Sequence, residues 1–230
     1  MRFTCFLCFI FALFFITQIG AHYNDAFYVD PLSAFQWNAE TYKATGHFYI
    51  IHLLSNSIVV NGSAVIAING TAQKIKLDLG PAGQYLIDSE VSYVWNPAQP
   101  NKCFNTSKTF SDQQAYYQHV KHVSTSILPK RGIIRSFSGR PKDAHACNDE
   151  EIGVNIITYR DNYKIIKWTF AQTSDGTELT KVQGTIEFTK YKKHKPISSD
   201  FELPSPCSDP DAIEEFCPSD SLAIRNLFLF

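Results

Sequence analysis

The sequence predicts a mainly β protein built on one large, mostly antiparallel sheet. From Gly46 onward, apolar and polar residues alternate with the period of two that is typical of strands. Turn-forming Asn, Asp, Gly and Pro residues separate these runs. Apolar residues make up 44% of the 230 residues and charged residues 19%, which is a globular composition with room for one domain or two small ones. A sheet of about seven or more strands tends to curl so that it buries one face.

The first segment, residues 1–21, is typical of a secretory signal peptide. Arg2 precedes a short apolar run that ends near Ile16, and the small residues Gly20 and Ala21 follow it. The run is shorter than the ~20 apolar residues that span a bilayer, so we expect cleavage and not a membrane anchor. No later stretch is long and apolar enough to span. We therefore expect a secreted protein without a transmembrane segment.

The first predicted strands are joined by tight turns. Residues 47–54 form an almost unbroken apolar run, which is typical of a buried strand. Residues 63–68 and 73–79 flank Asn69-Gly70, a dipeptide that accepts the positive φ of a hairpin turn. Residues 84–96 alternate again. Taken as one strand, they place Tyr85, Tyr93 and Trp95 on one face and Asp88 and Glu90 on the other, solvent-facing side.

The middle of the chain departs from this pattern. Residues 111–123 have helical character, with Ser111 as the expected cap and Gln114 three residues later. A loop is expected over residues 136–151. Three strand-like runs follow with short polar turns between them, which predicts a meander: 152–159, 163–170 and 179–191.

The cysteines and sequons agree with a secreted product. Four cysteines remain after signal cleavage, and an even number predicts two disulfides with three pairings: Cys103, Cys147, Cys207 and Cys217. Zinc is disfavoured because no CxxC or HxxxH spacing accompanies them. Three Asn-x-Ser/Thr sequons predict glycans on the surface: Asn61, Asn69 and Asn105. Residues 196–218 are rich in Pro, Ser and Asp, so we expect a tail that disulfides hold over the sheet.

Motifs for catalysis are missing from the sequence, so we expect that the protein is not an enzyme. It has no GxSxG, HExxH, P-loop or GxGxxG pattern. His119 and His122 would share a face of the predicted helix, but no Cys, Asp or Glu is placed as a third ligand, and a solvated surface is expected. The chain carries 21 basic and 22 acidic residues, which gives no electrostatic footprint for nucleic acid.

An acidic cluster lies near the end of the predicted tail. Its members are Asp209, Asp211, Glu214 and Glu215. Carboxylates at this spacing can hold calcium, which accepts loose oxygen coordination. No EF-hand pattern is present, so a solvated acidic loop is the simpler interpretation.

Aromatic and aliphatic residues recur on the predicted strand faces. They form either an ordinary filled core or the lining of an apolar cavity inside a curved sheet. The candidate cavity residues are Val65, Leu77, Tyr85, Tyr93, Trp95, Ile156, Trp168, Phe170 and Phe188.

Two segments resemble the ependymin-related secreted glycoproteins. One is the aromatic-rich stretch over residues 85–103, which ends at Cys103, and the other is residues 201–217, with Cys207 and Cys217. The resemblance implies a LolA-like fold: a strongly curved antiparallel sheet, or half-open barrel, with one or two helices. It also implies a hydrophobic ligand, a secreted or lysosomal location, a homodimer and a calcium site. It pairs Cys103 with Cys207 and leaves Cys147 for Cys217.

These observations give a domain of residues 22–200, followed by a disulfide-tethered tail of residues 201–230. The leading hypothesis is a secreted glycoprotein that binds a lipid or other hydrophobic small molecule in the cavity of the sheet. The alternative is a calcium-dependent extracellular adhesion or matrix glycoprotein with a filled core. A secreted hydrolase is a third interpretation, which lacks an identifiable nucleophile and base.

Overall fold

The chain forms one open twelve-stranded sheet in the computed structural model, which describes residues 33–37, 40–53, 55–95, 100–106, 109–139, 151–173, 182–203, 205–209 and 213–215. The strands are β1 Thr41–His52, β2 Ser57–Asn69, β3 Lys74–Asp78, β4 Gln84–Ile87, β5 Ser92–Trp95, β6 Cys103–Thr106, β7 Lys121–Leu128, β8 Gly132–Gly139, β9 Glu151–Tyr159, β10 Ile165–Thr173, β11 Val182–Tyr191 and β12 Ile213–Glu215. Residues 1–21, Cys147, Asp211 and Cys217 lie outside the described residues, and so do the predictions made for them.

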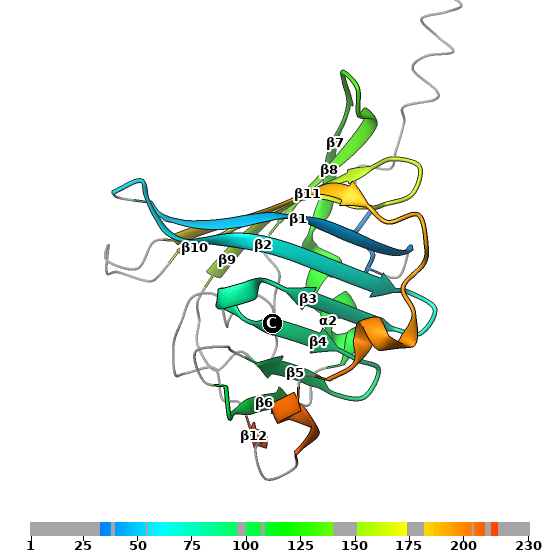
Figure 1. Ribbon diagram of the computed structural model, residues 1–230. Coiled ribbons are helices and arrows are strands. Elements are labelled where there is room, and N and C mark those ends of the chain that lie inside the picture. The colour runs from blue at the N-terminus through cyan, green and yellow to red at the C-terminus, as the bar shows by residue number, and fades with distance from the viewer. Residues whose placement is uncertain are drawn as a thin grey trace, which may run out of the picture.

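The strand order confirms the predicted fold class. It runs β12-β6-β5-β4-β3-β2-β1-β11-β10-β9-β8-β7, so β12 and β7 are the two edges and the sheet does not close (Figure 1). Every pair is antiparallel except β12 with β6, which is parallel. The single α-helix of the described residues is α2, Phe110–Tyr116. Short 3₁₀ segments accompany it in the described part of the chain: η2 Gly80–Ala82, η3 Tyr117–His119, η5 Ser198–Phe201 and η6 Ser205–Ser208.

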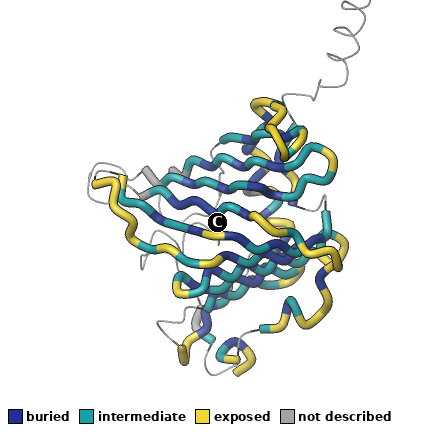
Figure 2. The backbone as a smooth tube through the Cα atoms, turned by 45° about the horizontal axis from the view of Figure 1, so that its top comes forward, coloured by how far each residue is buried: buried dark blue, intermediate teal, exposed yellow. Residues whose placement is uncertain are grey.

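Strand register divides the sheet into two faces. A row of cross-strand partners runs over five strands on what we call the inner face: Phe137, Ile156, Trp168, Ile186 and Phe48. All five are buried. The buried positions lie in the middle of the strands, while exposed residues gather at the hairpin ends (Figure 2). The inner face therefore carries the main core.

One glycine shows how closely the inner face is filled. Gly184 pairs with Phe170, and a Cβ atom at Gly184 would lie 1.9 Å from the Phe170 ring. The ring therefore lies over the bare backbone of its neighbour, where any side chain would displace it. This part of the sheet is a filled core.

The predicted helix over residues 111–123 is wrong in its length and its cap. The α-helix ends at Tyr116, η3 ends at His119, and β7 begins at Lys121. Thr109 caps it instead of Ser111: its hydroxyl accepts from the Asp112 N–H at 3.2 Å, and the Asp112 carboxylate accepts from the Thr109 N–H at 2.7 Å. Pairing of β7 with β8 overrides the local helical pattern.

Two further expectations fail with that helix. His119 ends η3 while His122 lies on β7, so the two imidazoles do not share a helix face. The first residues of the expected loop, Ser136 to Gly139, belong to β8. Both differences follow from the long-range pairing of β7, β8 and β9.

The C-terminal segment crosses the opposite side of the sheet, which we call the outer face. In Figure 1 it is the orange segment in front of β3 and β4, while α2 lies behind the sheet. Phe201 packs there with Ala67 and Leu86. Lys76 Nζ donates to the carbonyl oxygen of Glu202 at 2.7 Å, and the burial of Lys76 lowers the pKa of its ammonium group.

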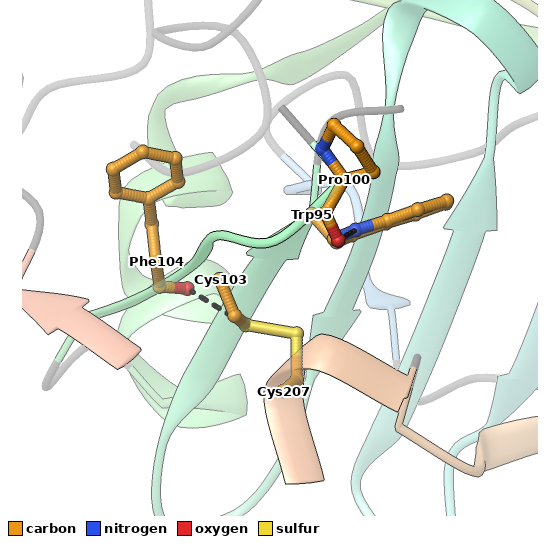
Figure 3. The surroundings of a disulfide bond; sticks show 5 residues. All are labelled: Trp95, Pro100, Cys103, Phe104 and Cys207. Atoms are coloured by element: carbon orange, nitrogen blue, oxygen red, sulfur yellow. Dashed lines mark hydrogen bonds between the residues drawn. A yellow bond between two sulfur atoms is a disulfide. The ribbon is translucent and has the colours of Figure 1, made fainter. Parts of the chain in front are cut away.

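A disulfide fixes this segment, as predicted. Cys103 on β6 is bonded to Cys207 in η6, and both residues are buried (Figure 3). The neighbouring Trp95 indole donates to the carbonyl oxygen of Pro100 at 3.4 Å. The tail is thus covalently attached to β6, the neighbour of the edge strand β12.

An ion pair between Lys43 and Asp200 also holds the tail, and we expect it to act mainly above pH 4. The hydrogen bond from Lys43 lowers the pKa of the Asp200 carboxyl. Because the folded pKa is depressed, the stabilisation is present above the unfolded pKa and is lost as pH falls through the folded value, below about pH 4. Asp200→Asn should lower the unfolding free energy at pH 7 by less than about 1 kcal/mol and by less than that at pH 2.5.

Urea unfolding at the two pH values measures this difference. Glu90→Gln removes an exposed carboxylate outside the tail and is the matched control. An equal loss for Asp200→Asn at both pH values would contradict the ion-pair explanation.

Candidate functional site

A short segment and a helix cover the inner face. We call residues 33–37, α2 and η3 together the cover. The N–H of Phe35 donates to the carbonyl oxygen of Val120 at 2.9 Å, and the N–H of His122 donates to that of Ser33 at 2.8 Å. The N–H of Phe110 donates to the carbonyl oxygen of Asp88 at 2.7 Å. The cover is therefore attached at the start of β7 and at the turn between β4 and β5.

One glutamine joins the two parts of the cover. The side-chain oxygen of Gln114 accepts from the N–H of Trp37 at 2.8 Å, and its side-chain nitrogen donates to the carbonyl oxygen of Phe35 at 3.0 Å. Both bonds link residues far apart in sequence. They hold residues 35–37 against α2.

Edge-to-face aromatic contacts press the cover onto the sheet. The Trp37 ring lies 5.0 Å from Phe35, 5.3 Å from Tyr117 and 5.2 Å from Trp168, between ring centroids. Phe35 lies 5.7 Å from Phe137 on β8. Such pairs add about 0.5–1.5 kcal/mol each beyond the area they bury. Trp37 is the centre of this cluster.

A narrow apolar pocket lies between the cover and the sheet. It is lined by Trp37, Ile66, Ile75, Leu77, Tyr85, Ile87, Gln113 and Trp168. The free space holds about one water molecule. The indole Nε1 of Trp37 is buried and has no hydrogen-bond partner among the described residues. The pocket wall is therefore mainly apolar, and its side chains with polar groups are two tryptophans, a tyrosine and a glutamine.

The structure brings together only part of the predicted cavity set. Leu77, Tyr85 and Trp168 line the pocket. Three more members share the inner face as buried core residues: Ile156, Phe170 and Phe188. The other three lie on the outer face, because their cross-strand partners are outer-face residues: Val65, Tyr93 and Trp95. Ligand contact by any of these nine residues stays a prediction.

The shared face expected for Tyr85, Tyr93 and Trp95 is wrong for a simple geometric reason. Residues 84–96 form two strands, and Ile87 pairs with Ser92 across the turn. Paired residues face the same side, so the odd-numbered inner positions of β4 are followed by even-numbered inner positions on β5. Tyr85 therefore faces inward beside Val94, while Tyr93 faces outward beside Leu86.

The pattern of alternation also failed to identify the cover. Phe35 and Trp37 precede the first strand, and Gln113 and Gln114 lie on a seven-residue helix. None of these residues belongs to a period-two run. Two aromatic residues within three positions, just before a strand, were the only sequence signal for this segment.

The carboxylate of Asp88 and the imidazole of His122 have structural partners. Asp88 Oδ2 lies 2.7 Å from Lys74 Nζ; burial alone would raise the pKa of Asp88, but hydrogen bonds from Lys74 and Ser89 hold it below its ordinary value. His122 is buried, with Nε2 3.0 Å from Thr125 Oγ1. Within the described ranges, no three His, Cys, Asp or Glu residues are grouped to hold a metal ion. Calcium binding stays a prediction.

The sequons lie on strands that the structure describes. Asn61 is exposed on β2, whereas Asn69 at the end of β2 and Asn105 on β6 are half-buried. The side-chain oxygen of Asn69 accepts from the N–H of Ala72 at 3.0 Å. Glycosylation at all three remains a prediction, and Asn61 is the most accessible.

Comparison with protein-family models and with curated proteins finds no match. The ependymin-related resemblance therefore stays a prediction. Among the described residues, no helix has the length and apolar character to cross a membrane. The function has to be argued from the geometry of the inner face and its cover.

Proposed function

We propose that this protein is a secreted glycoprotein that binds a lipid or other hydrophobic ligand on the inner face of its sheet, beneath the cover. The supporting observation is the apolar pocket between two separate parts of the fold, with the sheet on one side and Trp37 and Gln113 of the cover on the other. Hydrophobic ligand sites are concave and apolar with a few polar groups, and they favour such junctions.

Binding in this proposal requires the cover to move, because the pocket now holds about one water molecule. The hydrogen bonds at Ser33, Phe35 and Trp37 contribute about 1 kcal/mol each. Burial of an alkyl chain gains about 0.8 kcal/mol per methylene. Before the cost of association, a chain of about twelve carbons therefore offsets the loss of these bonds and part of the aromatic contacts.

The first test is native mass spectrometry of the secreted protein, followed by organic extraction. A co-purified hydrophobic molecule near one per protein supports the proposal. Titration with dodecanol, followed through tryptophan emission, measures binding directly. A protein that carries no ligand and does not respond to dodecanol would refute the proposal.

We expect Leu77→Phe to weaken dodecanol binding by about tenfold or more. The larger side chain fills the pocket that Leu77 lines, at a stability cost of about 1–3 kcal/mol. Trp95→Phe on the outer face is the matched control and should leave binding unchanged. A thermal melt shows whether the Leu77→Phe variant is folded. Equal binding by the folded variant and the wild type would place the ligand elsewhere.

A further inference from the structure

An arginine faces the inner side of the sheet without a charged partner among the described residues. Arg135 lies on β8, two residues before Phe137, and so shares its face. It pairs with Thr158 on β9 and with Thr125 on β7. The Arg135–Thr158 pair therefore lies two residues, about 7 Å, along the strands from the Phe137–Ile156 pair.

Three polar atoms of Arg135 and Thr158 have no hydrogen bond to the described residues. Within the described part of the chain, the buried Nε and Nη1 atoms of Arg135 have no hydrogen-bond partner, and the Tyr163 ring lies 4.8 Å from the guanidinium carbon. Thr158 is 0% exposed, and its hydroxyl has no partner among the same residues. In contrast, Arg131 in the adjoining turn is paired with Glu187 at 3.1 Å.

Buried donors without partners are costly, at about 1–3 kcal/mol each and more for charged groups, so they call for an acceptor. A water molecule or a carbonyl group would satisfy the hydrogen bonds but not the positive charge. Two guanidinium nitrogens beside a hydroxyl group match the oxygens of a carboxylate or a phosphate, which a planar guanidinium binds with two parallel bonds. Thr125 is already bonded to His122, at 3.0 Å, which leaves Thr158 as the available hydroxyl.

We propose that Arg135 and Thr158 bind the acidic head group of an amphiphilic ligand whose hydrocarbon chain lies along the inner face; this inference rests on the proposed function. A series of contacting aromatic side chains joins the two places. Phe137 follows Arg135 on the same face and contacts Phe35 of the cover. Trp37 comes next and contacts Trp168, which lines the pocket. A chain that displaces residues 35–37 therefore leads from the arginine to the pocket.

The test compares dodecanoic acid with dodecanol, two ligands with the same chain length and different head groups. We expect the wild type to bind the acid at least about tenfold more tightly, as a charge-assisted hydrogen bond predicts. Arg135→Gln should bring the acid to the level of the alcohol and leave alcohol binding unchanged. Thr158→Val, which keeps the shape of the side chain, should weaken acid binding alone by a smaller factor. Arg131→Gln removes a neighbouring positive charge and is the matched control, with the acid preference retained.

The outcomes separate this inference from the proposed function. Equal binding of acid and alcohol by the wild type overturns the head-group site and leaves the carrier proposal standing. Binding of neither ligand overturns the carrier proposal. Inorganic phosphate that binds in an Arg135-dependent way, without any acid preference, assigns the site to a free anion and overturns the head-group assignment. If Arg135→Gln does not fold, the Thr158→Val variant decides: unchanged acid preference in that variant overturns the inference.

Discussion

Replacement of both Cys103 and Cys207 by alanine is expected to lower the free energy of unfolding by about 4–5 kcal/mol. The disulfide joins residues 104 positions apart, so it removes a large amount of loop-closure entropy from the unfolded chain. Alanine is the better substitute because both cysteines are buried, and a serine hydroxyl there would need a hydrogen-bond partner. The free energy of unfolding of a typical domain is only about 5–15 kcal/mol, so this one bond contributes a large part of the stability.

Urea unfolding followed by tryptophan emission measures the loss. The reduced wild type and the reduced double alanine variant are the matched control pair, and the two should unfold at the same urea concentration. Amide exchange in Ile213–Glu215 should also accelerate, because β12 pairs with β6 directly beside the bond. Unchanged unfolding of the double variant would mean that hydrogen bonds and Phe201 hold the tail without the disulfide.

The fold class was predictable because period-two alternation is a local property of the chain. Residues 73–79 show it clearly, and β3 places Ile75 and Leu77 inward as the pattern indicates. The boundary between β4 and β5 was not predictable in the same way. A turn of four residues, 88–91, joins the two strands. After this turn the inward-facing residues are even-numbered instead of odd-numbered, although the apolar alternation of the sequence continues.

Long-range pairing explains the other differences. Residues 121–128 carry Val, Thr and Ile, which favour strands, but their alternation is weak because much of β7 is exposed at the edge of the sheet. The sequence offered a helical interpretation of the same residues. Contact with β8 selects the strand, and that contact cannot be read from the residues of β7 alone.

The candidate site was only half predictable for a related reason. Its floor is the inner face of the sheet, where Leu77, Tyr85 and Trp168 follow from alternation. Its roof is the cover, whose residues meet the sheet through contacts such as Trp37 with Trp168. The position of Arg135, which has no hydrogen-bond partner among the described residues for its Nε and Nη1 atoms, is likewise a tertiary feature, since it depends on which groups the neighbouring strands bring to it.

Trp37→Ala is expected to lower stability while it strengthens ligand binding. The ring is 4% exposed and contacts three aromatic neighbours, so its loss should cost about 3 kcal/mol, near the lower end for a buried Trp. The lower end applies because the variant also removes a buried indole N–H that has no partner among the described residues. The space left by the Trp37 indole adjoins the pocket, so a ligand would no longer have to displace the indole ring.

Two measurements on one variant separate the effects. A thermal melt reports the destabilisation, and dodecanol titration should show affinity about tenfold or more above that of the wild type, since each methylene that gains a buried site adds about 0.8 kcal/mol. Trp95→Ala is the matched control: it removes an indole from the outer face, so it should not change dodecanol affinity. Weaker binding by a folded Trp37→Ala protein would mean that the indole contacts the ligand and forms part of the site. Stronger binding, with stability lost, identifies Trp37 as the residue that closes the inner face in the absence of ligand.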